Sequence, residues 1–182
     1  ATPLGERVTI DADEETSGSE TIRGVKWDGN RLAFTWSCPI PWTHGPSVDS
    51  GIVQYAGWSS LCRLELCIKN LMPGSYSLWV EGKKVIERLP MASWDRGVDV
   101  SRHMEWPATK RSLELKDLVT ERRARISKNW RDAVVIQKRS SDSATMTEMA
   151  ERATSAIAIR IRELSEPMVI HAVLRIEEEA SH

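Results

Sequence analysis

The stretch LCRLELCIKNLMPGSYSLWVEG, residues 61–82, decides which fold the sequence predicts. Apolar and polar side chains alternate in residues 64–69 and again in 76–81, which is the period-two pattern of strands that place one face on a core. A Met-Pro-Gly-Ser break separates the two runs. Because proline fits the first central position of a tight turn and glycine tolerates positive φ, we expect a chain reversal with Gly74 at positive φ. A further turn and a short strand at residues 85–86 complete a predicted meander of three antiparallel strands.

Strand patterns also occur on both sides of this stretch. Asp28-Gly29-Asn30 separates two apolar runs, and these residues suit the tight turn of a hairpin. Residues 89–107 show no regular pattern and are predicted to be irregular. The other predicted strands are Arg7–Ile10, Thr21–Trp27, Arg31–Trp36 and Met168–Ile176.

A long segment near the C-terminus has a different pattern. From Ala108 to Leu164 the sequence contains no glycine or proline, and apolar residues recur with a helical period. Ser143 is placed to cap a second helix, and Pro167 ends it. The predicted fold class is α+β: an antiparallel β-sandwich-like domain of residues 1–103 and 167–182, with a long antiparallel helical hairpin, residues 104–166, inserted into it.

Composition limits the classes of function. The 182 residues are 41% hydrophobic, which is enough for a core in one domain or two small ones. Charged residues make up 28%, but the formal net charge is −1. Because nucleic-acid binding normally requires a basic surface, no nucleic-acid partner is predicted. No run reaches the length of a membrane span, and the N-terminal segment lacks the apolar core of a signal peptide; a signal, if the protein is exported, lies outside this sequence.

The three cysteines, Cys38, Cys62 and Cys67, cannot all pair within one chain. A disulfide between Cys38 and either of the others is one interpretation. The alternative is that all three are small, buried or half-buried thiols. No C-x-x-C unit occurs and the four histidines lie far apart in the sequence, so no metal site is predicted. No cofactor is predicted either.

The order of these segments resembles the C-terminal region that follows the catalytic domain in a subgroup of bacterial SGNH (GDSL-type) hydrolases. The resemblance implies a non-catalytic accessory domain that packs on the catalytic domain of an esterase and shapes its substrate cleft. It also implies a substrate that is an acylated carbohydrate or a lipid-like ester, and a periplasmic or secreted location. The matching pieces are GVKWDGNRLAFTW (24–36), PIPW (39–42), IKNLMPGSYSLWVEGKKV (68–85), Gly97-Val98, NWRDA (129–133) and PMVIHAVLRIE (167–177).

The catalytic blocks of that family do not match this sequence. The family has a Gly-Asp-Ser block that carries the nucleophile, whereas the nearest string here is Val-Asp-Ser-Gly around Ser50, without the preceding glycine. The family's acid and base lie in an Asp-x-x-His block, but Asp99 and His103 are four residues apart. The α/β domain that would hold these blocks is also missing before residue 104. No catalytic residue is therefore predicted, and a hydrolase that uses Ser50 and His103 is kept as a third hypothesis.

Tryptophan is unusually frequent, with eight residues against one Phe and two Tyr. Flat indole rings match the apolar faces of sugars, so exposed tryptophans in loops would suit a free-standing carbohydrate-binding module, which is the alternative function. The competing interpretation is that these rings anchor a core. The residues in predicted loops, and therefore the candidates for ligand stacking, are Trp42, Trp58, Trp94 and Trp106.

The first predicted helix is too long for a small sheet to cover. About thirty residues at 1.5 Å each give a helix of ~45 Å. A typical strand is much shorter, about 17–20 Å. Its far end is predicted to contact a catalytic domain that precedes Ala1 in the native protein, or a second copy of the chain. The apolar residues near that end are Ile126, Trp130 and Val134. The sequence leaves open the substrate, the oligomeric state and whether the native chain continues upstream of Ala1.

Overall fold

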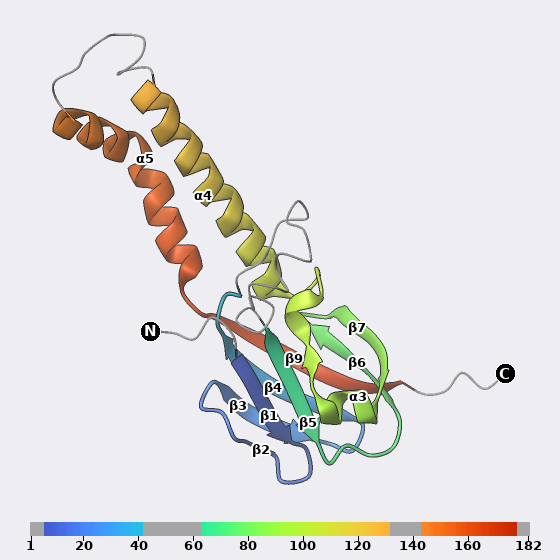
Figure 1. Cartoon of the computed structure of the whole chain (residues 1–182). Helices are drawn as coiled ribbons and strands as arrows, with labels where there is room; N and C mark the ends of the chain where they lie inside the picture. The colour runs from blue at the N-terminus through green and yellow to red at the C-terminus, as the bar shows by residue number, and fades with distance from the viewer. Residues whose placement is uncertain (1–5, 42–62, 132–142, 178–182) are drawn as a thin grey trace. The chain divides into compact units, whose positions relative to one another are not determined.

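The computed structural model describes residues 6–41, 63–131 and 143–177, apart from a few side chains of the long helices (Figure 1). The chain divides into two compact units. The first contains residues 1–111 and 167–182, and the second contains residues 112–166.

The first unit contains two β-sheets. Sheet A has the strand order β2-β1-β5-β8, and sheet B has the order β3-β4-β9-β6-β7. All pairings are antiparallel except that of β1 with β5, which is parallel. The strands of sheet A are β1 (Glu6–Asp11), β2 (Thr16–Ser17), β5 (Leu64–Lys69) and β8 (Val98–Asp99). Those of sheet B are β3 (Ile22–Trp27), β4 (Arg31–Cys38), β6 (Ser75–Val80), β7 (Lys83–Pro90) and β9 (Met168–Glu177).

Both predicted hairpins of sheet B are confirmed. In the β3–β4 turn, the Asp28 carboxylate accepts hydrogen bonds from the backbone N–H groups of Asn30 (3.1 Å) and Arg31 (2.7 Å). This is the local side-chain bonding by which aspartate favours a turn. β6 and β7 pair through a turn in which Glu81 and Gly82 both have positive φ, which matches the φ requirement of a two-residue hairpin loop.

The predicted three-strand meander is wrong. β5 pairs with β1 and β8 in sheet A, whereas β6 belongs to sheet B, so residues 70–74 carry the chain from one sheet to the other. Alternation identifies which face of a strand is buried but does not identify its partner. The left-handed residue of this connection is Asn70, with φ of 58°. Gly74 has positive φ as predicted, but its value of 159° is close to extended backbone.

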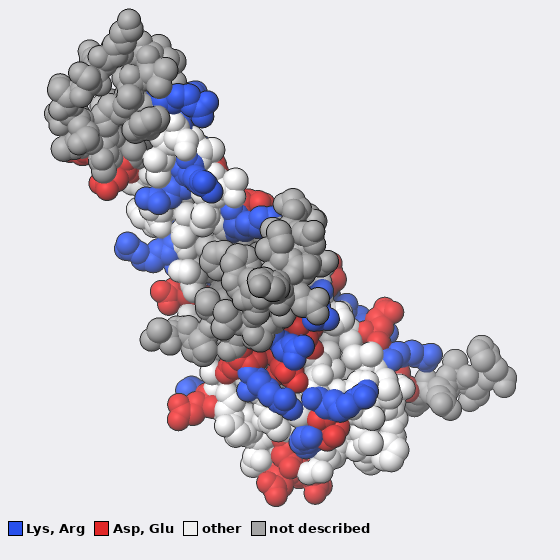
Figure 2. All heavy atoms as spheres, in the orientation of Figure 1, with Lys and Arg blue, Asp and Glu red and all other residues white. Residues whose placement is uncertain are grey.

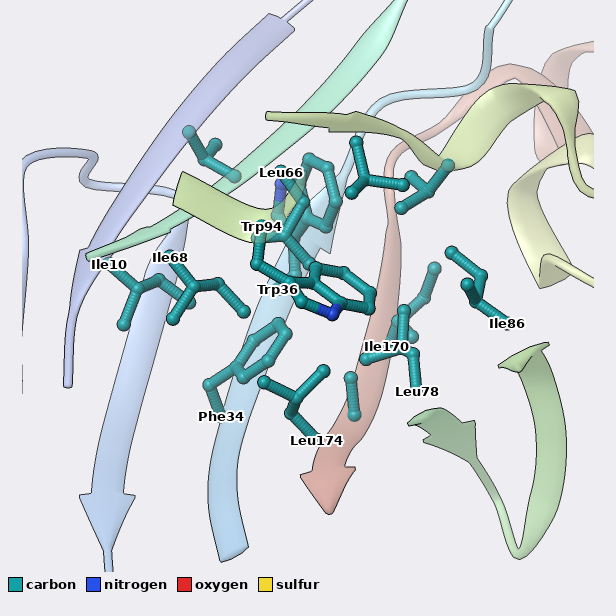
Figure 3. Close-up of a cluster of buried hydrophobic side chains, with 14 of the residues drawn as sticks. Ile10, Phe34, Trp36, Leu66, Ile68, Leu78, Ile86, Trp94, Ile170 and Leu174 are labelled. Atoms are coloured by element: carbon teal, nitrogen blue, oxygen red, sulfur yellow. The ribbon is translucent and has the colours of Figure 1, made fainter. Parts of the chain in front are cut away.

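Buried side chains from both sheets form one hydrophobic core (Figure 3). β9, the middle strand of sheet B, shows how the alternation builds it. Ile170, Ala172 and Leu174 are buried, while Val169 and His171 on the opposite face are exposed. This confirms the predicted strand and its two faces. The largest fully buried side chains are Trp36, Trp94, Trp106, Tyr76, Ile10, Leu32, Leu64, Leu66, Ile68, Leu78, Ile170 and Leu174.

The segment predicted to be irregular contains three short elements, so that prediction is wrong for most of its length. Helix α3 (Met91–Arg96) follows β7 directly, with Pro90 as its N-cap. β8 and the 3-10 helix η1 (Val100–Arg102) come next. A helix of six residues is less than two turns long, too short for a helical period to be visible in the sequence.

The two long helices occur where the sequence predicts them. Helix α4 spans Pro107–Arg131 and helix α5 spans Ser143–Ser165. An ion pair joins them, with 3.2 Å between Arg160 Nη2 and Glu114 Oε1. Their arrangement as a hairpin inserted into the β domain stays a prediction.

No helix in the described part of the chain is long and apolar enough to cross a membrane.

Candidate functional site

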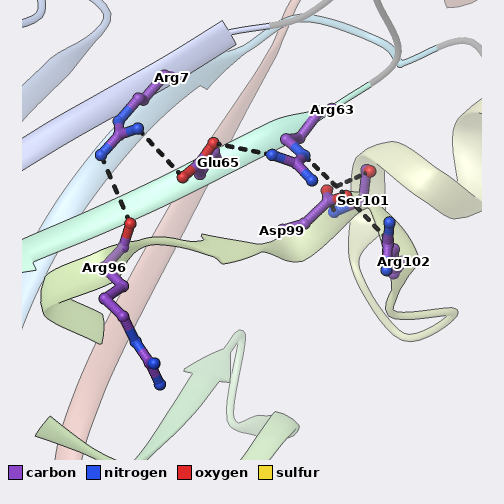
Figure 4. Close-up of polar contacts among 7 residues, drawn as sticks. All are labelled: Arg7, Arg63, Glu65, Arg96, Asp99, Ser101 and Arg102. Atoms are coloured by element: carbon purple, nitrogen blue, oxygen red, sulfur yellow. Dashed lines mark hydrogen bonds and ion pairs between the residues drawn. The ribbon is translucent and has the colours of Figure 1, made fainter. Parts of the chain in front are cut away.

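Five charged side chains lie on the outward side of sheet A, three of them in β1, β5 and β8, one directly before β5 and one in η1. The parallel register places Arg7 of β1 opposite Glu65 of β5, and the antiparallel register places Glu65 opposite Asp99 of β8. Their neighbours Val8, Leu64, Leu66 and Val98 point into the core, so strand alternation directs the charged side chains away from it. We name this group the arginine–carboxylate cluster; it consists of Arg7, Arg63, Glu65, Asp99 and Arg102 (Figure 4).

The cluster is a row of ion pairs in which the charges alternate. Arg7 Nη1 lies 3.4 Å from Glu65 Oε1, and Arg63 Nη1 lies 3.5 Å from Glu65 Oε2. Arg63 Nε is also 3.7 Å from Asp99 Oδ2. These distances exceed the 2.7–2.9 Å of a strong charge-assisted hydrogen bond. The two arginines therefore sit near the carboxylates without being tightly bound to them.

Asp99 holds the end of the row in place. It is the N-cap of η1, where its carboxylate accepts hydrogen bonds from Ser101 N (3.2 Å) and Ser101 Oγ (2.6 Å). Its second oxygen accepts a hydrogen bond of 3.1 Å from Arg102 Nε. A short polar side chain at a helix start satisfies backbone N–H groups in this way. The negative charge of Asp99 is thus fixed by the local fold.

Gly97 leaves the space that Glu65 occupies. A Cβ atom at residue 97 would overlap Glu65 Oε1 and would lie 2.9 Å from Glu65 Cδ, closer than real Cβ contacts come. Gly97 also has φ of 109°, a conformation that L side chains rarely adopt. The Gly97-Val98 element, one of the segments that carry the family resemblance, therefore has a physical role in placing the cluster.

Exposure separates the charges of the cluster into two layers. The Glu65 and Asp99 side chains are each 14% exposed, whereas Arg7, Arg63 and Arg102 are 58%, 47% and 71% exposed. Figure 2 shows basic side chains gathered over this part of the surface, with acidic atoms between them. Three guanidinium groups and two carboxylates leave a net charge of +1. The arrangement presents guanidinium groups outward and can bind an anionic group.

The described contacts include no hydrogen bond or ion pair between His103 and Asp99. The described contacts of the Asp99 carboxylate are to Ser101, Arg63 and Arg102. Burial lowers the pKa of the half-buried His103, and the Asp99 charge opposes that shift from a distance. Ser50 lies outside the described residues. A hydrolase site that uses Ser50 and His103 is therefore not assembled by the part of the chain that the structure describes.

Two of the four tryptophans proposed for ligand stacking, Trp94 and Trp106, do not lie at the surface. Trp94 and Trp106 are both 0% exposed and belong to the core, so the prediction that they stack on a ligand is wrong. Trp106 packs at 5.6 Å between ring centroids against Trp36. Trp42 and Trp58 lie outside the described residues. Loop position in a sequence does not reveal that a segment folds back over a core, which is what happens around Trp94 and Trp106.

The predicted interface at the end of the first helix stays a prediction. Ile126 is half-buried in α4. Trp130 belongs to the same helix, but its side chain is not described, and Val134 lies outside the described residues.

Cys38 and Cys67 are buried free thiols, so a disulfide involving Cys38 is wrong and the buried-thiol alternative holds for both. Burial raises the pKa of Cys38 to about 12. The Cys67 thiol donates to the Asp95 carbonyl at 3.0 Å. Cys62 lies outside the described residues. Within the described ranges, no three His, Cys, Asp or Glu side chains are grouped so that they could hold a metal ion.

Comparison with known proteins gives one informative result. No family model matches the chain, and no curated protein matches it either. Among solved structures, the chain is similar to a gut microbial diltiazem-metabolizing enzyme, with a TM-score of 0.70 at 14% sequence identity. The match covers 94% of this chain and 49% of that enzyme, so the chain spans about half of that protein's length. This likeness shows a shared fold.

Proposed function

We propose that this chain is a non-catalytic accessory domain of an SGNH (GDSL-type) ester hydrolase, where it packs on the catalytic domain and shapes the substrate cleft. The observation that carries the proposal is the unequal coverage of the structural match. Nearly all of this chain, 94%, corresponds to 49% of an enzyme, which leaves half of that enzyme for another part. An accessory domain has this relation to the enzyme that contains it.

The chemistry of the neighbour's named substrate agrees with the proposal. Diltiazem is an acetate ester, so ester hydrolysis is one reaction by which an enzyme can metabolise it. The family resemblance of this sequence leads independently to ester hydrolysis. The two lines of argument therefore support the same reaction class for the partner domain.

The segments that carry the family resemblance have structural roles in the first unit. Residues 24–36 form most of the β3–β4 hairpin, and residues 68–85 include β6, the turn that follows it and the start of β7. Residues 167–177 supply β9, which joins these two hairpins into one sheet. Three of the segments that carry the resemblance thus contribute to sheet B, and Gly97, in another of them, shapes the arginine–carboxylate cluster.

We also propose that α4 and α5 form an antiparallel helical hairpin inserted between the last two strands, with residues 104–166 as the insertion and residues 1–103 and 167–182 as the β domain. The ion pair between Arg160 and Glu114 supports this arrangement because it joins a residue late in α5 to one early in α4. The separation of residues 112–166 as a compact unit supports it as well.

An esterase assay tests the proposal. Purified residues 1–182 are incubated with p-nitrophenyl acetate and p-nitrophenyl butyrate, and release of p-nitrophenol is compared with release in buffer. The expected result is no turnover above buffer. Turnover that is lost in Ser50→Ala or His103→Ala would show that the chain is itself a hydrolase and would overturn the accessory assignment.

The structure weakens the alternative function, a free-standing carbohydrate-binding module. Two of its four candidate rings, Trp94 and Trp106, are fully buried. The module would have to rely on Trp42 and Trp58. Isothermal titration of the chain with acetylated xylan oligosaccharides, repeated with Trp42→Ala and Trp58→Ala, tests that alternative directly.

A further inference from the structure

We propose that the arginine–carboxylate cluster is the surface through which this chain docks on an acidic face of its catalytic domain. Carboxylates of that face would pair with the guanidinium groups of Arg7, Arg63 and Arg102. This inference rests on the proposed accessory function and names the contact surface that the function requires.

The three guanidinium groups use few of their hydrogen-bond donors on the described part of the chain. Each guanidinium has five N–H donors. Arg7 uses its donors at 3.4 Å on Glu65 and at 3.5 Å on the Arg96 carbonyl. Within residues 6–41, 63–131 and 143–177, Arg63 makes two long ion pairs, with Glu65 and Asp99, and Arg102 makes one contact, with Asp99. The contacts to the described residues therefore use only a few of the donors on each side chain.

The cluster is poorly explained as a device for stability. Ion pairs of exposed arginines contribute about 0–1 kcal/mol each, and the long distances of the Arg7 and Arg63 pairs place those pairs at the weak end of that range. Yet a glycine at positive φ is required so that Glu65 can reach its position. A glycine that makes room for a partly buried carboxylate in a set of weak ion pairs is hard to account for by stability alone.

The shielded carboxylates pre-organise the arginines. Glu65 lies between Arg7 and Arg63, and Asp99 lies between Arg63 and Arg102 (Figure 4). Each guanidinium group is thus attracted to one region of the surface by a partly buried negative charge, although the long ion pairs of Arg7 and Arg63 do not fix a single conformation. A partner that binds a group already confined to one region costs less side-chain entropy.

The shape of the cluster favours a protein face over a small anion. Its charges follow one another in a row, from Arg7 through Glu65, Arg63 and Asp99 to Arg102 (Figure 4). A single phosphate or sulfate is best held by donors that converge on one point. Spaced guanidinium forks fit several carboxylates on one surface, each of which can accept a planar, two-point contact.

Nuclear magnetic resonance of the whole chain tests this assignment without knowledge of the catalytic domain. The probe is a ten-residue poly-L-glutamate peptide, added to ¹⁵N-labelled residues 1–182 at low salt. We expect saturable shifts of the side-chain Nε–Hε signals of Arg7, Arg63 and Arg102. The shifts should decrease in 0.5 M NaCl, because exposed charges are screened.

Two triple variants with the same change of charge provide the comparison. The cluster variant should bind the peptide about tenfold more weakly than wild type, whereas the helix variant should bind like wild type, since its exposed basic residues lie in α4. The cluster variant is Arg7→Gln, Arg63→Gln, Arg102→Gln, and the helix variant is Arg123→Gln, Lys128→Gln, Arg131→Gln.

The alternatives give distinct results. Equal weakening in both variants would mean that only net charge matters and would overturn the proposal. Inorganic phosphate that binds the cluster as tightly as the peptide would identify a small-anion site and overturn it as well. Either result leaves the esterase assay unaffected, so failure of the docking surface and failure of the accessory function can be told apart.

Discussion

Replacing Gly97 with alanine is expected to destabilise the first unit by about 1–4 kcal/mol. Residue 97 has φ of 109°, and a non-glycine residue held in such a conformation is strained by about 1–3 kcal/mol. The new methyl group would also overlap Glu65 Oε1, so the Glu65 side chain must leave its position between Arg7 and Arg63. Loss of those two exposed ion pairs adds about 1 kcal/mol or less.

Urea unfolding followed by tryptophan fluorescence measures the effect, because Trp36, Trp94 and Trp106 are all buried in the same core. For a chain of this length, the expected change corresponds to a melting temperature lower by about 2–15 °C. Gly97→Ala within about 0.5 kcal/mol of wild type would refute the reasoning, since that is the ordinary range of surface substitutions.

Two other glycines separate the effect of backbone conformation from the effect of crowding. Gly82 has φ of 78°, and a Cβ atom added there would have nothing within 4 Å, so Gly82→Ala measures the effect of backbone conformation without crowding. Gly18 has open space and no positive φ, and Gly18→Ala should be close to neutral. Glu65→Ala in the Gly97→Ala background should restore the part of the lost stability that is due to crowding. No recovery of stability would show that Glu65 is not the group displaced.

Three further predictions concern the core and the sheet edge. The indole N–H of buried Trp94 has no hydrogen-bond partner in the described part of the chain, so Trp94→Phe loses no hydrogen bond and should destabilise by less than about 1.5 kcal/mol. Trp94→Ala leaves a cavity and should destabilise by about 3–5 kcal/mol in the same urea assay. Equal effects of the two substitutions would contradict the prediction. A Cβ at Gly74 would lie 3.1 Å from Ile176 Cδ1, so Gly74→Val should destabilise the protein by about 1–3 kcal/mol through overpacking. Adding Ile176→Val to Gly74→Val should restore part of the lost stability. An unchanged melting temperature in Gly74→Val would show that the site can accommodate the side chain. Hydrogen bonding to Lys84 lowers the pKa of Glu177, so the stabilisation by this carboxylate is present above the ordinary glutamate pKa of about 4.3 and is lost as pH falls through the lower, folded-state pKa. The stability difference between wild type and Glu177→Gln should therefore shrink between about pH 5 and pH 3. A difference independent of pH would contradict the assignment.

Local sequence signals predict the elements of this fold better than their pairing. Asp28-Gly29-Asn30 and the alternation after Pro167 are complete within a few residues, and the structure confirms both. The parallel pairing of β5 with β1 joins residues more than fifty positions apart, and alternation carries no information about such a partner. The meander prediction failed because it assumed that neighbours in sequence are neighbours in the sheet.

The candidate site shows the same limit. Arg63 and Glu65 are visible in the sequence only as the polar face of a strand, and Asp99 only as a weak match to a catalytic block. They come together because β5 pairs with β1 and with β8 at the same time. Gly97 is the one sequence signal that could have drawn attention to them, because a glycine directly before a strand marks close approach of another group.

The position of β9 in sheet B also has a consequence for how a newly made chain reaches its native state. β9 lies between β4 and β6, yet the ribosome makes it after both of them. Until residues 168–177 have been synthesised, the hairpins β3–β4 and β6–β7 each present a strand whose backbone N–H and C=O groups lack their final partner. Such open strands can pair with other chains, and incomplete domains are prone to aggregate for this reason. Sheet B therefore cannot form progressively as its strands are made, and a chaperone that covers open strands would be most useful to this protein before β9 is complete.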